Sequence, residues 1–174
     1  MIWNPFKTNK ERTLVFVCSA NMTRSPFFEG YLKKVIRENP DPSLHDLNII
    51  SAGLNARKGG LVNPVIAHVA HLMGFYLGKH RTQPFNNKIA RTADLLLTME
   101  TSHKEAILEK YPKLEGKVFT VKEFGNSNGR EIPLDIPDPT GQEVDDFREF
   151  VEDAVSETGR ILDVLEIQGL HLHS

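Results

Sequence analysis

The chain has 174 residues, of which 40% are hydrophobic and 25% charged, and its formal net charge is -2. This length and apolar content suit a single globular domain over 1–174 with a sizeable core. The balanced charge argues against a nucleic-acid partner or a membrane surface, and no run of about 18 apolar residues could cross a bilayer. The single cysteine, Cys18, excludes an internal disulfide and a multi-cysteine metal cluster, which favours a reducing, cytoplasmic location.

Short apolar runs alternate with amphipathic segments along the chain. The predicted elements are a strand at 13–18, a helix from about 25 to 38, a strand at 47–51, a helix at 63–74, a strand at 94–99, a helix capped by Thr101 or Ser102 that stops near 112, a strand at 117–121 and a long helix from 142. Residues 123–141 are irregular, 1–12 are interpreted as an N-terminal extension and 168–174 as a frayed tail. This alternation predicts a parallel sheet with helices on both faces.

The loop after the first strand carries the most informative chemistry. Ligands of such sheets bind beyond the carboxyl ends of the strands, and the first strand ends on Cys18. Six residues, 19–24, then lead to the helix start at Ser25. Successive backbone N–H groups in such a loop, from Ser19 through Met22 to Ser25, can converge on an anion. The side chains that are small enough to let a ligand approach this backbone are Ser19, Ala20, Asn21 and Thr23. The planar guanidinium of Arg24 has two parallel N–H groups that match two phosphate oxygens. Together with the loop N–H groups, this positive charge favours a thiolate at Cys18. Asn21 also tolerates the left-handed conformation that such a turn requires.

These residues resemble the low-molecular-weight protein tyrosine phosphatases. The match begins with V-C-x-x-N-x-x-R-S-P at 17–26 and continues along the chain with four further motifs: Ser-Ala-Gly at 51–53, His-Arg-Thr at 80–82, Asp-Leu-Leu-Leu-Thr-Met-Glu at 94–100 and Asp-Ile-Pro-Asp-Pro at 135–139. The resemblance implies a three-layer αβα sandwich with a four-stranded parallel sheet, of the phosphotyrosine protein phosphatase I type. It also implies phosphomonoester hydrolysis through a phosphocysteine, with phosphotyrosine on a protein, or a small phosphomonoester, as the substrate.

The resemblance also implies a role for each matching residue. Cys18 would be the nucleophile, with Arg24 and the loop amides of residues 19–25 holding the phosphoryl oxygens, and Asp138 would act as acid and then base. Asp135 is the alternative acid. Ser25 would donate a hydrogen bond to the sulfur, and His80 would brace the loop through Asn21 and Ser25. No metal ion or other cofactor is expected, because the loop itself compensates the phosphate charge.

The sequence departs from the family pattern at several positions. Ala20 stands where glycine is usual, and a positive φ there would strain an alanine. Thr23 replaces a second cysteine that many members carry, and Thr140 replaces an aromatic residue that forms a pocket wall. The segment at 54–61 also lacks an aromatic residue. These changes weaken the phosphotyrosine assignment more than the phosphatase assignment.

Three alternatives follow from these departures. The enzyme could act on phosphoarginine or another phosphorylated side chain. It could also be a catalytically weak module that holds a phosphorylated partner. Arsenate reduction is disfavoured. The relatives that catalyse it pass the oxidation on to further cysteines, which end as a disulfide, and this chain has no cysteine besides Cys18.

Overall fold

The computed structural model describes residues 12–40, 44–126 and 133–170. Four parallel strands form one sheet in the order β2-β1-β3-β4. Their bounds are Arg12–Cys18 for β1, Leu47–Gly53 for β2, Leu95–Thr98 for β3 and Val118–Thr120 for β4. The helices are α1 (Arg24–Glu38), α2 (Pro64–Leu72), α3 (Asn87–Thr92), α4 (Thr101–Lys110), the short 3-10 helix η2 (Pro112–Leu114) and α5 (Val144–Leu170).

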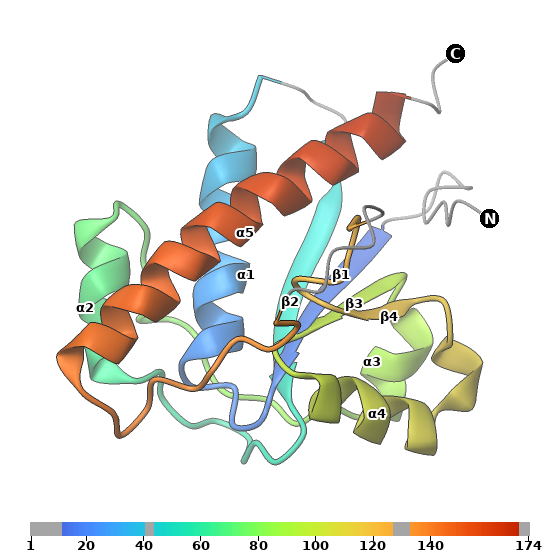
Figure 1. The fold of residues 1–174 in the computed structure, drawn as a ribbon, viewed down its shortest axis with the longest axis horizontal. Coiled ribbons are helices and arrows are strands. Elements are labelled where there is room, and N and C mark those ends of the chain that lie inside the picture. The colour runs from blue at the N-terminus through green and yellow to red at the C-terminus, as the bar shows by residue number, and fades with distance from the viewer. Residues whose placement is uncertain (1–11, 41–43, 127–132, 171–174) are drawn as a thin grey trace.

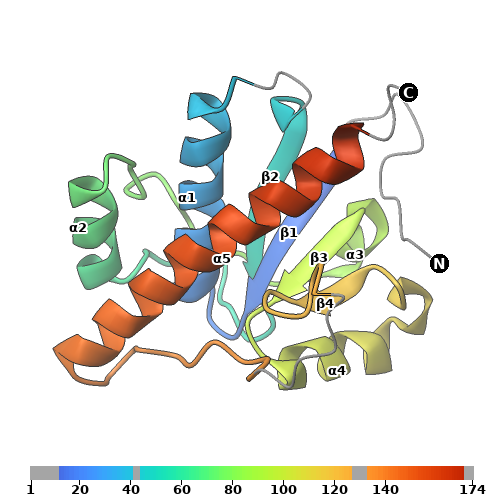
Figure 2. The same ribbon diagram turned by 45° about the horizontal axis from the view of Figure 1, so that its top comes forward.

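Helices cover both faces of this sheet (Figure 1). Side chains alternate along β1, so that Leu14 and Phe16 enter a core with α1 and α5, whereas Val15 and Val17 enter a second core with α3 and α4. The long helix α5 runs obliquely across one face, beside α1, while α3 and α4 lie toward the opposite side (Figure 2). The predicted three-layer sandwich with a four-stranded parallel sheet is thereby confirmed.

All four predicted strands and the four predicted helices are present. The N-terminus of α2 follows the sequence signal closely, because the Asn63 side chain accepts hydrogen bonds from the N–H groups of Val65 and Ile66, and Pro64 is the first helical residue. The six-residue helix α3 was not predicted, since it is too short to show a helical period.

The predicted cap of α4 is wrong. The N-cap residue is Glu100, and its side chain makes no capping bond. Instead, the carboxylate of Asp135 accepts hydrogen bonds from the Thr101 N–H at 2.7 Å and the Thr101 hydroxyl at 2.8 Å. A carboxylate 34 residues away in the chain therefore caps this helix, which no local pattern could show.

Some predictions concern residues beyond the described ranges. The proposed N-terminal extension at 1–12 lies outside them except for Arg12, the first residue of β1. In the proposed tail at 168–174, α5 continues to Leu170, and 171–174 fall outside the description. Among the described helices, none has the length and apolar character needed to span a membrane.

Candidate active site

The loop at 18–25 joins β1 to α1 at the carboxyl edge of the sheet. Its first two carbonyls are fixed from one side, because Leu54 N–H donates to Cys18 O and Asn55 N–H donates to Ser19 O, each at 2.9 Å. Gly53 allows this close approach: a Cβ atom there would lie 2.6 Å from Ser19 O. A side chain at position 53 would therefore displace the loop.

The Cys18 sulfur lies among hydrogen-bond donors. Its Sγ atom is 3.0 Å from Ser25 Oγ and accepts from the Asn21 N–H at 3.2 Å. Cys18 is 3% exposed and Ser25 is fully buried. Donors aimed at a sulfur stabilise the thiolate relative to the thiol.

Asn21 is the central residue of the loop. With φ at 57°, it is the one non-glycine residue of the described ranges in the left-handed region. The strain considered for Ala20 is therefore not found there, because the turn places the positive φ one residue later, where asparagine tolerates it.

The Asn21 side chain connects three segments. Its Nδ2 group donates to Ser25 Oγ at 2.9 Å and to Ser51 Oγ at 2.8 Å, while its Oδ1 accepts from the Gln83 N–H at 3.0 Å. His80 Nε2 lies 3.1 Å from the Asn21 carbonyl oxygen, which can only accept, so the ring nitrogen donates. His80 thus contacts the loop at Asn21, while its other ring nitrogen lies 3.8 Å from a carboxylate oxygen of Glu29 and not at Ser25.

Arg24, near the end of the loop and first residue of α1, is buried, with 1% of its surface exposed. Its Nη1 donates to the Ile136 carbonyl at 2.9 Å and pairs with Glu100, while its Nη2 donates to Asp138 Oδ2 at 2.8 Å. The buried Nε atom has no partner among the described residues. An unsatisfied guanidinium N–H on the residue that ends this loop is a donor available to a bound anion.

The segment at 133–141 brings a carboxylate to this arginine. The Ile136 N–H anchors the segment by donating to Met99 O at 2.7 Å. Asp138, whose side chain is 39% exposed, faces Arg24, and its Oδ1 accepts from the Thr140 N–H at 2.9 Å. Asp135 instead accepts hydrogen bonds from Thr101 at the start of α4. Of the two candidate acids, Asp138 is the one in contact with the loop residue Arg24.

Two of the departures noted in the sequence meet in space. The hydroxyl oxygens of Thr23 and Thr140 lie 2.8 Å apart. Thr23 precedes Arg24 in the loop, and Thr140 follows the Asp138-Pro139 pair. This hydrogen bond links the segment that carries the nucleophile candidate to the segment that carries the acid candidate.

Sequence reasoning missed two polar residues near the start of α4. Glu100 pairs with Arg24, and His103 Nε2 lies 2.9 Å from Ser19 Oγ. Burial lowers the pKa of His103 from its ordinary value of 6.5. Glu100 is the last residue of the Asp-Leu-Leu-Leu-Thr-Met-Glu motif at 94–100. Nothing in the sequence around His103 distinguished it from the other six histidines.

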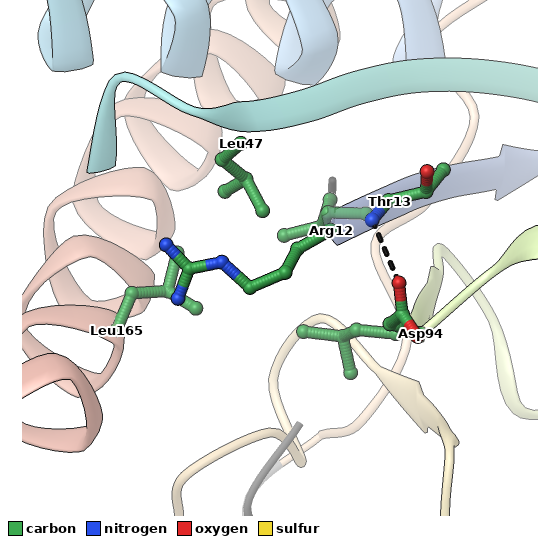
Figure 3. A pocket seen from close by; sticks show the side chains of 7 residues that line it. Arg12, Thr13, Leu47, Asp94 and Leu165 are labelled. Carbon is green, nitrogen blue, oxygen red and sulfur yellow. Dashed lines mark hydrogen bonds between the residues drawn. The ribbon is translucent and has the colours of Figure 1, made fainter. Parts of the chain in front are cut away.

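A small hollow lies at the other end of the sheet (Figure 3). Arg12, Leu47 and Leu165 line it, and the Thr13 N–H donates to Asp94 Oδ2 at 2.9 Å beside it. Because β1 runs from Arg12 to Cys18, this hollow is separated from the 18–25 loop by the length of the strand. In the described part of the chain no three His, Cys, Asp or Glu residues gather as a metal site.

A parallel α/β sheet that places a thiol, a buried guanidinium and a carboxylate together at its carboxyl edge defines a class, the cysteine-dependent phosphatases. Comparison with known proteins agrees with this class. The family described as "Low molecular weight phosphotyrosine protein phosphatase" matches residues 13–168. The chain therefore belongs to the low-molecular-weight protein tyrosine phosphatase family.

Individual relatives differ in the substrate that their names state. The low-molecular-weight protein-tyrosine-phosphatase Wzb of Salmonella typhimurium is 34% identical over 77% of this chain and 80% of its own length. The protein-arginine-phosphatase of Bacillus subtilis is 29% identical over 78% of this chain and 85% of its own length. The solved structure of the YwlE arginine phosphatase from Geobacillus stearothermophilus superposes with a TM-score of 0.81 at 25% identity, over 94% of this chain and 98% of that one.

Proposed function

We propose that the protein hydrolyses phosphorylated side chains through a phosphocysteine at Cys18. The observation that carries this proposal is the contact between Arg24 Nη2 and Asp138 Oδ2 at 2.8 Å, which joins the segment at 133–141 to the loop that begins at the hydrogen-bonded Cys18. This contact supports the proposal because it joins the candidate acid to the candidate oxyanion donor of the loop that starts at Cys18.

In the first step, the Cys18 thiolate attacks phosphorus as the bond to the leaving oxygen breaks. Arg24 and the loop N–H groups hold the other phosphoryl oxygens, where negative charge is spread in the transition state. Asp138 delivers its proton to the departing oxygen and becomes a carboxylate. A bound phosphoryl group competes with Asp138 for Arg24 Nη2, and its negative charge favours the protonated acid.

In the second step, water attacks the phosphocysteine. The Asp138 carboxylate takes a proton from this water, the S–P bond breaks and inorganic phosphate leaves. The electron pair returns to the sulfur, where Ser25 and the Asn21 N–H stabilise the departing thiolate. At the end of the cycle Asp138 again carries its proton and the Cys18 sulfur its negative charge.

Replacing Asp138 by asparagine tests the acid assignment. The variant is expected to lose about 10²-fold or more in kcat/KM with phenyl phosphate, a poor leaving group, and much less with p-nitrophenyl phosphate, whose leaving group needs no proton. Asp135→Asn is the matched control, since it changes the other carboxyl of the same segment. Equal losses with both substrates in Asp138→Asn, or a selective loss in Asp135→Asn, would reassign the acid.

We propose phosphotyrosine in proteins as the substrate class, as the family and the Wzb relative suggest. Phosphoarginine is the second candidate, because Thr140 replaces an aromatic wall and two of the relatives described above are named arginine phosphatases. Turnover of matched phosphotyrosine, phosphoarginine and phosphoserine peptides decides between them. Phosphopeptide binding by calorimetry without phosphate release would instead indicate a binding module.

We further propose that catalysis needs no metal ion and takes place in the cytoplasm. Arg24 and the loop amides compensate the phosphate charge, which is the task a metal would otherwise perform. A nucleophilic thiol also has to stay reduced, and Thr23 supplies no neighbouring sulfur to trap an oxidised Cys18 as a disulfide. Full turnover in the presence of EDTA is the expected result.

A further inference from the structure

The first turn of α4 supports the 18–25 loop from the side opposite His80 and Gln83. Glu100 at the helix N-cap pairs with Arg24, and His103 in the first turn reaches Ser19 Oγ at 2.9 Å. Ser19 directly follows the nucleophile candidate. The His103 side chain is 7% exposed and Ser19 is half-buried, so the contact is partly shielded from solvent.

The surroundings of the ring determine which nitrogen carries the proton. His103 Nε2 lies 3.8 Å from Glu100 Oε1, and a lone pair facing a carboxylate would be repelled. The other nitrogen, Nδ1, is buried and has no partner among the described residues, so a proton on it would be an unsatisfied donor. Both arguments place the proton on Nε2, which then donates to Ser19 Oγ.

The same geometry keeps the ring neutral. A second proton would have to sit on the buried Nδ1, and burial is the largest cause that lowers the pKa of His103, with the Arg24 charge acting in the same direction. Three carboxylates act in the opposite direction without reversing it: Glu100, Asp135 and Asp138.

We propose that His103 is a positioning residue of the active site, whose neutral Nε2–H group fixes the Ser19 hydroxyl and, through it, the start of the 18–25 loop. Because Ser19 Oγ accepts from the ring, its own hydrogen is free to be donated to an oxygen of the bound phosphoryl group. This inference rests on the proposed phosphatase function and adds a residue that acts through Ser19 and does not itself touch the substrate.

Four variants test the proposal kinetically. His103→Leu and Ser19→Ala each remove the hydrogen bond and are expected to lower kcat/KM about tenfold, with good and poor leaving groups alike, because the loop acts on both. His103→Gln places an amide N–H near the position of Nε2 and should recover most of the loss. The double variant Ser19→Ala/His103→Leu should be no worse than either single variant. His68→Gln, which changes an exposed histidine of α2, is the matched control and should behave as the parent.

Additive losses in the double variant, or no recovery with His103→Gln while the variant unfolds at the same temperature as the parent, would overturn the proposal. Because Ser19→Ala removes only one hydroxyl, it tests the hydrogen bond even if His103→Leu fails to fold. A change confined to poor leaving groups would also contradict it, since that pattern belongs to Asp138.

Nitrogen NMR of the His103 ring gives a readout that does not depend on turnover. The expected signals are a bare Nδ1 and a protonated Nε2 that persist below pH 6.5, with the Nε2 signal shifting in Ser19→Ala. A bare Nε2, or a ring that titrates at its ordinary pH, would refute the proposal. If the parent protein shows these signals and binds inorganic phosphate without any phosphatase activity, the proposed function fails while the assignment of His103 stands.

Discussion

Replacing Cys18 by serine is expected to reduce turnover of p-nitrophenyl phosphate by roughly 10⁴-fold or more. A serine hydroxyl must lose a proton to attack phosphorus, and its surroundings would not remove that proton. The Asn21 N–H donates to the sulfur, and the Ser25 hydroxyl, 3.0 Å away, would donate to it once it is a thiolate, so both groups stabilise an existing anion. The thiol reaches that anionic form far more readily than a hydroxyl does.

The loss should affect chemistry without affecting the phosphate site. Cys18→Ser is close in shape to the parent, so inorganic phosphate, measured by calorimetry, is expected to bind within about threefold of the parent affinity. Retention of turnover within tenfold of the parent would show that Cys18 is not the nucleophile. Loss of phosphate binding together with activity would show instead that the sulfur shapes the loop.

Replacing Arg24 by lysine is expected to lower kcat/KM by roughly 10²- to 10³-fold although the charge is retained. Lysine is a point donor and cannot offer the two parallel N–H groups that match two phosphoryl oxygens. It also cannot hold Glu100, the Ile136 carbonyl and Asp138 at the same time, as the guanidinium does. The segment at 133–141, which carries Asp138, should therefore lose its position relative to the 18–25 loop as well.

Arg160→Lys is the matched control for this substitution. Arg160 is a partly buried arginine of α5 that pairs with Glu157 and donates to the Val121 carbonyl, away from the 18–25 loop. Lysine there should change the unfolding temperature but leave kcat/KM within about twofold. If Arg24→Lys binds inorganic phosphate as tightly as the parent, the assignment of Arg24 as the phosphate-binding fork is wrong.

The fold was accessible from sequence because its signals are local. The apolar run that ends at Cys18 predicted a buried strand, and the pairing of Asn63 with Pro64 predicted the start of α2, which the side-chain cap confirms. The loop chemistry was accessible for the same reason, since its residues are consecutive. Asn21 was expected to tolerate a left-handed backbone, and it adopts one.

The contacts that complete the site were not accessible, because they join residues far apart in the chain. Thr23 and Thr140 are separated by 117 positions and His103 and Ser19 by 84, so no periodicity or spacing connects them. Each side chain considered alone is typical of a surface turn or a helix. Only the parallel pairing of β1 with β3 brings the start of α4 beside the loop.

Local sequence alone also could not separate the roles of Asp135 and Asp138. Both lie within the irregular segment at 123–141, on either side of Ile136 and Pro137. Their difference lies in their partners, because one caps α4 through Thr101 and the other contacts Arg24.

Trapping the phosphorylated enzyme tests the central claim most directly. In Asp138→Asn, attack by water should be slow, so a phosphoenzyme formed from p-nitrophenyl phosphate accumulates and survives a rapid denaturing quench. Mass spectrometry of the digested protein is expected to place one phosphoryl group on the Cys18 sulfur. A phosphoryl group on a histidine, aspartate or serine, or stoichiometric release of p-nitrophenol with phosphate and no covalent adduct, would contradict the account.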